Sequence, residues 1–192
     1  AYVDRPDDPH DATRGFWWSH VGWLVMKNPR VGDPVKIRKF ARDIYADPYL
    51  RWLSYDVTQI LLQVALGLVL LGLGGWDYVV WGIFVRVVFV YHVTWLINSA
   101  THKYGYRNFD SPDGSTNTWW VAILAFGEGW HNNHHACPDV APAGLKWWEV
   151  DPTFGVIWVL ERLGVAHSVK RYGIPDRNQE IGAPVEDLPS VS

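Results

Sequence analysis

Two long apolar stretches follow each other directly in this chain. The first, residues 57–76, reads "VTQILLQVALGLVLLGLGGW" and carries no charge, and the second runs over residues 77–102. A helix that crosses a bilayer needs about 20 mostly apolar residues, so each stretch is long enough. A Gly-Gly pair leaves only a short turn between them. The pattern therefore predicts a helical hairpin with transmembrane arms at about 57–75 and 78–100.

Charged residues around these stretches indicate the orientation of the hairpin. The sequence "KIRKFAR" precedes the first arm and "HKYGYR" follows the second, so both outer ends are basic. Cytosolic segments of membrane proteins carry an excess of Lys and Arg, which predicts an integral membrane protein with both outer ends, and any site that they carry, facing the cytosol. Arg86 lies within the second arm, at a cost of roughly 2.5–3.5 kcal/mol, so we expect it to face protein or reach the interface. Two buried helices of a soluble protein are the alternative, but the uncharged run favours the membrane.

The flanking regions predict further helices and polar loops. Residues 15–26, "GFWWSHVGWLVM", are too short to span a bilayer and predict a buried or interfacial helix. Helices are also expected over 118–136, "TWWVAILAFGEGWHNNHHA", and over the amphipathic stretch 151–166. Residues 103–117 are typical of a loop, and the polar tail 174–192 is typical of disorder. The predicted fold class is all-α: a membrane helical hairpin with a cytosolic helical cap.

Composition excludes several functional classes. A net charge of −3 and a pI near 6.2 argue against a nucleic-acid partner. A single cysteine excludes a disulfide framework, and no GxGxxG motif for a nicotinamide or flavin is present. Thirteen tryptophans are consistent with membrane interfaces, where an apolar ring with one N–H is favoured. The start, "AYVDRPDDPHD", resembles neither a signal peptide nor a helix start, so we expect part of a longer protein or a processed product.

Histidines supply the candidate chemistry. "HNNHH" places His131, His134 and His135 at i, i+3 and i+4, on one face if the segment is helical. Neutral imidazole is the commonest metal ligand in proteins. His102 ends the sequence "NSATH", with Asn98 four residues before it on the same predicted helix face. The sequence therefore predicts a metal site made of four imidazoles.

The other histidines fit the metal site less well. His20, in "WWSHVGW", is expected to be a hydrogen-bonded structural residue, and His10, in "DDPHD", a loop or capping residue. His92 lies inside an apolar arm and suits helix packing or a substrate channel, whereas His167 receives no role. A zinc hydrolase is a further interpretation of "HNNHH", but the glutamate of an HExxH motif is missing.

Three stretches together resemble one family. "DPHDATRGFWWSHVGWL", "TWLINSATHKYGYRNFD" and "FGEGWHNNHHACP" look like the membrane-bound fatty acyl desaturases of the delta-9, stearoyl-CoA desaturase type. The resemblance covers most of residues 1–170. HxxHH alone is shared with alkane hydroxylases, sterol oxidases and carotenoid hydroxylases, and the other two stretches narrow the choice. The resemblance implies the C-terminal part of a four-transmembrane-helix fold, with a desaturase domain over 1–173.

The resemblance also implies a non-haem diiron centre held by histidines. By position, the implied site consists of iron ligands His102, His131, His134 and His135, a water-mediated contact from Asn98, acyl-tunnel residues Thr94 and Trp95, and a residue near the acyl-carrier headgroup, Lys27. The family's HxxxxH box and earlier HxxHH box do not occur in these residues. The sequence is therefore expected to begin just after the second box and to be inactive alone.

The implied activity is that of an oxidoreductase. It would insert a cis double bond, of delta-9 type, into an acyl chain by an O2-dependent reaction at iron. The implied partners are an acyl-CoA or acyl-lipid substrate, membrane lipid, and an electron-donor protein of ferredoxin or cytochrome b5 type. A related diiron hydroxylase or ketolase and a non-catalytic lipid-binding membrane fragment stay open as alternatives, as do the acyl carrier and the donor.

Overall fold

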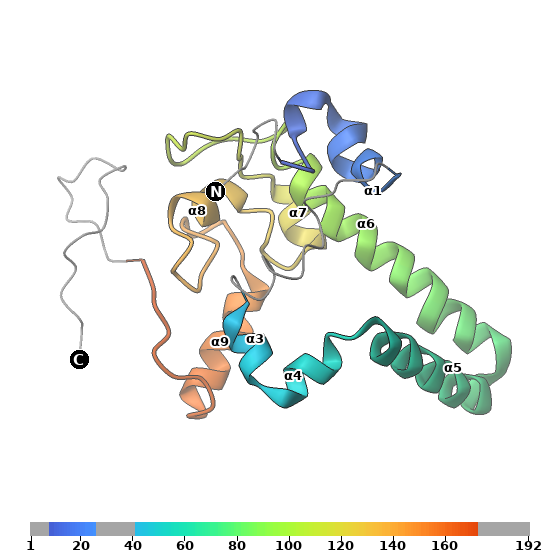
Figure 1. Cartoon of the computed structure of the whole chain (residues 1–192). Helices are drawn as coiled ribbons and strands as arrows, with labels where there is room; N and C mark the ends of the chain where they lie inside the picture. The colour runs from blue at the N-terminus through green and yellow to red at the C-terminus, as the bar shows by residue number, and fades with distance from the viewer. Residues whose placement is uncertain (1–7, 26–40, 173–192) are drawn as a thin grey trace. The chain divides into compact units, whose positions relative to one another are not determined.

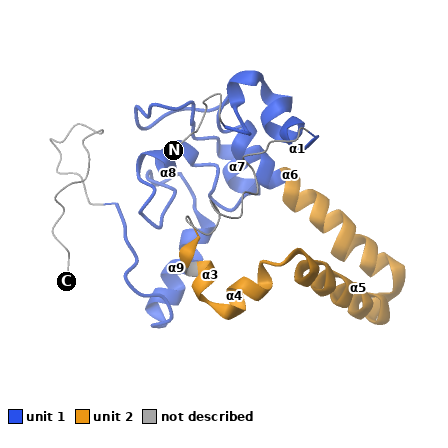
Figure 2. Cartoon of the chain, viewed as in Figure 1, with its two compact units in different colours: residues 1–25, 93–192 blue, residues 26–92 orange. Residues whose placement is uncertain are grey.

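The computed structural model describes residues 8–25 and 41–172. Across these residues the secondary structure is helical. Within 8–25 and 41–172 no strand forms, and the only β-type pairings there are isolated bridges from Asn117 to Tyr106 and Trp130. The prediction of an all-α chain is therefore confirmed for the described part. The chain divides into two compact units, residues 1–25 with 93–192, and residues 26–92 (Figure 2).

The unit over residues 26–92 is built from consecutive helices. They are α3 (Arg42–Ala46), α4 (Pro48–Leu53), α5 (Asp56–Val79), the π-helix η3 (Val80–Val85) and the first half of α6 (Arg86–Ser99). The start of α4 is set by Asp47, whose carboxylate accepts hydrogen bonds from the Tyr49 and Leu50 amides. Proline at the first position of α4 is favoured because its missing N–H has no intrahelical partner there.

The chain reverses direction inside α5. Gly74 and Gly75 leave the helical conformation, with φ/ψ of −152°/17° and 70°/−158°. A residue with a side chain rarely adopts the second pair of angles, so glycine is needed at this turn. Residues 56–73 and the helix after the turn form two arms (Figure 1). The structure thus contains the Gly-Gly turn that the sequence predicted.

Side chains link the two arms at two levels. Gly82 lies against Leu70, so closely that a Cβ added at Gly82 would be 2.6 Å from Leu70 Cδ1. Farther from the turn, the Arg86 guanidinium donates a hydrogen bond of 2.9 Å to Gln63 Oε1. Arg86 therefore finds a polar protein partner on the opposite arm, in keeping with its expected cost in an apolar surrounding.

The surface of this helical stretch is strongly apolar. Apart from the turn at Gly74 and Gly75, the chain is helical from Asp56 to Ser99, and its most apolar 18-residue window has a mean hydropathy of 2.0 with 6% of its residues buried. Leu73 and Trp81 are 72% and 70% exposed. By length and composition this is the one helix among the described residues that could cross a membrane. Exposed apolar area of this extent is unusual on a soluble monomer and indicates association with a membrane.

The second unit carries the histidines. Its helices are η1 (Ala12–Arg14), the π-helix η2 (Trp18–Gly22), α1 (Trp23–Val25), the second half of α6, α7 (Trp119–Leu124), α8 (His131–Ala136) and α9 (Pro152–Arg162). Its apolar core is small and consists of Ala100, Val121 and Ala125, against which pack Phe16, Val93, Leu96, Ile97 and Trp120. Elements distant in sequence therefore meet around the end of α6.

Two helix predictions need correction. The helix expected over 118–136 is divided into α7 and α8, because Phe126 and Gly127 adopt positive φ values of 52° and 113°. The helix expected to include His102 ends at Ser99, and His102 lies in the turn that follows. The expected helices over 15–26 and 151–166 correspond to η2 with α1 and to α9. Lys27 and the tail 174–192 lie outside the described residues.

Candidate metal centre

Three histidines converge from two separate elements. His102 comes from the turn after α6, and His131 and His135 come from successive turns of α8. One ring nitrogen of each lies within 4.8 Å of those of the other two. The ring centroids are 5.1 Å apart for His102 and His131 and 4.3 Å for His131 and His135. This spacing suits imidazoles that share a metal ion.

The environment of His131 fits a metal ligand. Its side chain is buried, and within the described part of the chain Nδ1 has no hydrogen-bond partner. Burial lowers the pKa of His131 well below the ordinary 6.5. Repulsion from the neighbouring His135, His102 and His134 lowers it further, so the ring is neutral near pH 7. A buried nitrogen without a hydrogen-bond partner destabilises the folded protein. A metal ion bound by the lone pair of the neutral imidazole would remove this cost. The residues present therefore fit a metal ion.

His135 is oriented by a carboxylate. Its Nδ1 lies 2.6 Å from Asp113 Oδ2, and Asp113 Oδ1 also accepts hydrogen bonds from Ser111 and Ser115. Burial alone would raise the pKa of Asp113, but the hydrogen bonds from His135 and Ser115 outweigh it and hold the pKa well below its usual range. Metal-binding histidines usually donate their second N–H to such a group, which fixes ring orientation. The sequence predicted only a loop over residues 103–117, so the contact of Asp113 with His135 was not foreseen.

The fourth predicted ligand lies apart from this cluster. His134 is exposed, and its ring centroid is 6.0 Å from those of both His131 and His135. On a helix, positions 131 and 135 differ by about 40° in direction, whereas position 134 points about 60° to the other side of 131. The structure therefore brings three of the four predicted histidines together, and His134 borders them.

Hydrogen bonds from a neighbouring segment hold the turn that carries His102. The Thr101 carbonyl accepts bonds from Thr116, from its amide at 2.6 Å and its hydroxyl at 2.8 Å. The Thr101 hydroxyl in turn donates to the Ile97 carbonyl. Thr101 is fully buried. The backbone on one side of His102 is thus fixed both to the preceding helix and to the segment leading into α7.

The two asparagines of "HNNHH" lie on other sides of α8 than the histidine cluster. Asn133 is opposite His131 and His135, and Asn132 lies at the flank, about 100° from His131. Asn132 and Asn133 are fully buried. The Asn132 Oδ1 atom accepts the amides of Asn108 and Phe109, both at 2.8 Å, and the Asn117 Oδ1 atom accepts the Asn132 amide at 3.1 Å. These bonds tie α8 to the loop that follows His102. The asparagines therefore anchor the helix while the histidines face the metal position.

The residues implied for the substrate and for bridging water lie on α6. Asn98 is half-buried one helical turn before His102, Thr94 is exposed, and Trp95 is half-buried. The Trp95 ring meets the His20 ring edge-on, with centroids 5.9 Å apart. The roles assigned to Thr94, Trp95 and Asn98 stay predictions.

The two histidines expected to be structural have structural contacts. His20 is buried, and its Nδ1 lies 3.0 Å from Ser99 Oγ. Because the Ser99 hydroxyl donates to the Trp95 carbonyl at 2.8 Å, the imidazole is the donor in the His20–Ser99 bond. His10 packs edge-on against the Trp23 ring at 4.3 Å, and its amide donates to the Asp8 carboxylate. His20 thus links the N-terminal segment to α6, and His10 packs within that segment. Neither set of contacts needs a metal.

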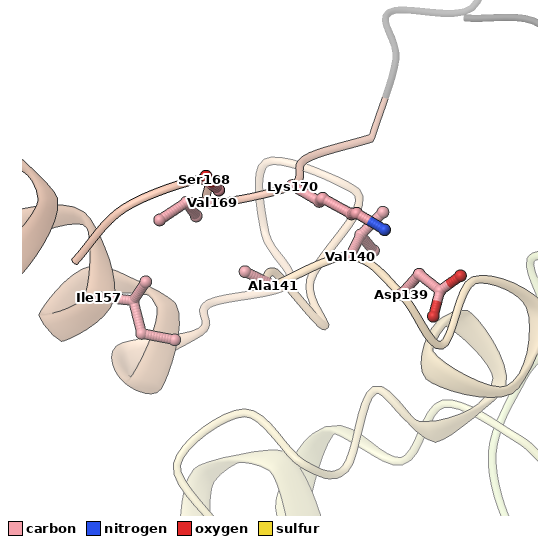
Figure 3. A pocket seen from close by; sticks show the side chains of 7 residues that line it. All are labelled: Asp139, Val140, Ala141, Ile157, Ser168, Val169 and Lys170. Carbon is pink, nitrogen blue, oxygen red and sulfur yellow. The ribbon is translucent and has the colours of Figure 1, made fainter. Parts of the chain in front are cut away.

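A surface pocket lies elsewhere in this unit. It has a volume of about 350 Å³ between α9 and the segments around positions 140 and 169 (Figure 3). Its lining residues are Asp139, Val140, Ala141, Ile157, Ser168, Val169 and Lys170. None of the four histidines contributes to this wall. The pocket therefore does not carry the chemistry of the metal centre.

Comparisons with known proteins identify the family. The model of the fatty acid desaturase family matches residues 1–167. An sn-1 stearoyl-lipid 9-desaturase from Anabaena variabilis is 55% identical over 88% of this chain and 60% of its own length. Another from Synechocystis sp. is 52% identical over 88% of this chain and 52% of its own length. An icosanoyl-CoA 5-desaturase from Limnanthes douglasii is 43% identical over 88% of this chain and 47% of its own length.

The matches cover most of this chain but only part of each relative. This chain spans about half to three fifths of the length of the relatives that it matches. The match to the family model nevertheless covers most of the 192 residues, including the turn after α6 and all of α8. The resemblance drawn from the three sequence stretches is thereby confirmed. The chain belongs to the fatty acid desaturase family.

Proposed function

We propose that this chain forms part of a membrane-bound acyl-lipid desaturase that introduces a cis double bond of delta-9 type. One observation carries the proposal: His102, His131 and His135 converge, and a buried, unpartnered nitrogen of His131 lies among them. Family membership supports the reaction class. The two most similar relatives compared above are named lipid 9-desaturases, and this supports a lipid-linked acyl substrate over acyl-CoA.

The proposed cofactor is iron, two ions in the active enzyme. His102, His131, His134 and His135 are the proposed ligands in this chain, with Asn98 reaching the centre through water. Two irons need more ligands than these four side chains provide. When bound, the irons would activate O2 to remove two hydrogens from adjacent methylene groups, because no side chain is a strong enough oxidant.

The chain's own residues would prepare this site. Asp113 holds the His135 ring in one orientation, and burial keeps His131 neutral and able to bind metal. Thr94 and Trp95 are the proposed tunnel residues, where an apolar wall would align a straight acyl chain and exclude water. Lys27 is the proposed contact to the polar end of the substrate.

The proposed location is the membrane, with the metal centre on the cytosolic side. The apolar arms 56–73 and 76–99 are 18 and 24 residues long, which suits a bilayer core about 30 Å thick. Basic residues flank both outer ends, so both ends are assigned to the cytosol. The proposed source of electrons is a donor protein of ferredoxin or cytochrome b5 type.

The test is expression of the protein from its own gene in a host that cannot make unsaturated acyl chains. We expect membrane lipids with a cis-9 double bond, measured by gas chromatography of fatty-acid methyl esters, and we expect positional lipase digestion to locate the product on the glycerol backbone. The variant His131→Ala is the inactive control. Hydroxylated acyl chains would point to a hydroxylase, and a purified protein containing zinc without iron would refute the proposal.

A further inference from the structure

A buried glutamate lies behind the metal centre and has no role in the proposal above. Glu149 is 4% exposed, and five groups donate hydrogen bonds to its carboxylate. Oε1 accepts from the Tyr106 hydroxyl and, at 2.7 Å, from Asn108 Nδ2. Oε2 accepts the amides of Leu145 and Lys146 at 2.7 and 3.0 Å. Burying a carboxylate is costly, and five donors are enough to keep it ionised.

The fifth donor connects Glu149 to α8. Asn133 Nδ2 donates to Glu149 Oε2 at 2.8 Å and to the Ala143 carbonyl at 2.9 Å. On its other side, Asn133 Oδ1 accepts bonds of 2.8 Å from the side-chain amides of Asn108 and Asn117. All four hydrogen-bonding positions of the Asn133 amide are therefore used. The amide has one orientation in this network, and the carboxylate of Glu149 helps to determine it.

Because of the position of Asn133 on α8, its hydrogen bond to Glu149 affects the direction of the histidines. Successive residues of a helix turn by 100°, so Asn133 points about 160° away from both His131 and His135. A bond that fixes Asn133 thus fixes the rotation of α8 about its axis. The helix has only six residues, too few to hold its own orientation. Rotation by a few tens of degrees would turn both histidines away from His102.

We propose that Glu149 is a positioning residue for the metal centre. It acts through Asn133 and sets the rotation of α8, and so the directions in which His131 and His135 present their nitrogens. The inference rests on the proposed metal-binding function. Asn108 strengthens the same link, because its Nδ2 atom donates both to Glu149 and to Asn133. In the described part of the chain, the five hydrogen bonds to the Glu149 carboxylate come from groups other than the histidines.

The test measures metal binding rather than turnover. In the variant Glu149→Gln, the amide N–H₂ faces hydrogen-bond donors whichever carboxylate oxygen it replaces. The hydrogen bonds that orient Asn133 are therefore weakened. In the purified protein made from its own gene, titration with Fe(II) and with Co(II) gives the affinity, and the Co(II) absorption spectrum reports ligand geometry. We expect a loss of affinity of about tenfold, the lower end of the loss seen when a direct hydrogen-bond partner of a metal ligand is removed, together with a changed Co(II) spectrum.

A matched control separates positioning from general stability. Asp151 is a half-buried carboxylate that also accepts neutral donors, the amides of Ala143 at 2.7 Å and Phe154 at 2.9 Å, but none of its hydrogen bonds within the described part of the chain comes from α8. The variant Asp151→Asn should lower the melting temperature without changing metal affinity or spectrum. Tyr106→Phe removes a single donor from Glu149 and should give a smaller loss of affinity in a protein that still folds.

The outcomes separate the two proposals. Wild-type protein that binds metal but makes no unsaturated product would refute the desaturase activity alone. Wild-type affinity and spectrum in Glu149→Gln, or an equal loss of affinity in Asp151→Asn, would refute the positioning role alone. If Glu149→Gln does not fold, unchanged metal binding in Tyr106→Phe refutes it instead. A wild-type protein that binds neither metal would refute both.

Discussion

Replacing Gly129 by alanine should separate two backbone segments that support the metal centre. Gly129 lies two residues before His131 and faces the start of α7. A Cβ there would lie 2.6 Å from Ala122 Cα and from the Thr118 carbonyl oxygen, and closer still to the Ala122 amide nitrogen. The Gly129 carbonyl also accepts the Thr118 amide at 2.8 Å. All of these neighbours are backbone atoms, so no flexible side chain can move aside.

The cost follows from the size of this overlap. Ordinary contact begins at 3.4 Å, so the segments must separate by about 1 Å. Overpacking of this kind costs about 1–3 kcal/mol, and the upper end applies because backbone must move. A loss of about 3 kcal/mol lowers the ratio of folded to unfolded protein more than 100-fold. The same displacement acts close to His131, and we expect weaker iron binding as well.

The assay compares Gly129→Ala with Gly155→Ala. Gly155 lies inside α9, and a Cβ there meets no atom within 4 Å. Alanine is favoured over glycine in a helix by about 0.5–1 kcal/mol, so this control should be slightly stabilised. Thermal unfolding in detergent and iron content per protein are the measurements. A Gly129→Ala protein with the melting temperature and iron content of the wild type would show that the close approach of these segments does not matter.

Three further predictions concern separate parts of the chain. Asp113→Asn should lower iron affinity about 10- to 100-fold with little change in melting temperature, because it releases a ligand ring; an unchanged iron titration would contradict this. Gly75→Ala should destabilise the protein by about 1–3 kcal/mol in detergent unfolding, because its φ is 70°, whereas Gly67→Ala, in open space, should not. Burial raises the pKa of Glu149, but its hydrogen bonds outweigh this and lower it below the ordinary 4.5. Its stabilisation is therefore present above pH 4.5 and lost as pH falls further. The melting temperature of wild type should fall more steeply there than that of Glu149→Gln, and parallel curves would exclude this contribution.

Local patterns in the sequence predicted the features that depend on neighbouring residues. The uncharged run before Gly74 and the Gly-Gly pair predicted a helix that turns back, and the structure has that turn. The spacing of "HNNHH" predicted imidazoles on adjacent turns, and His131 and His135 lie together on α8. In each case the sequence pattern and the feature that it predicts involve residues close together in the chain. Helical periodicity and the residues that favour turns determine the conformation over such short distances.

Features that depend on contacts between residues far apart in the sequence could not be predicted from local patterns. The helix predicted over 118–136 breaks at Phe126, a residue whose positive φ no local pattern indicates. Asp113 meets His135 across 22 positions, and Glu149 meets Asn133 across 16. Hydrophobic periodicity reports which side of an element is buried, but it does not report which polar group lies opposite. A carboxylate or amide flanked by turn residues therefore looks like an ordinary loop residue.

The way in which α8 is held explains why polar residues dominate around this centre. The apolar core nearby consists mainly of Ala100, Val121 and Ala125 and supplies little area to bury. Apolar packing also tolerates repacking, since dispersion contacts have no preferred direction. Hydrogen bonds are directional, and a buried amide such as that of Asn133, with all its donors and acceptors used, has one arrangement. Metal ligands must point at a common centre. Asn133, on the opposite face of α8, and the buried Asn132 beside it do what a larger apolar core could not: they fix the rotation of a six-residue helix.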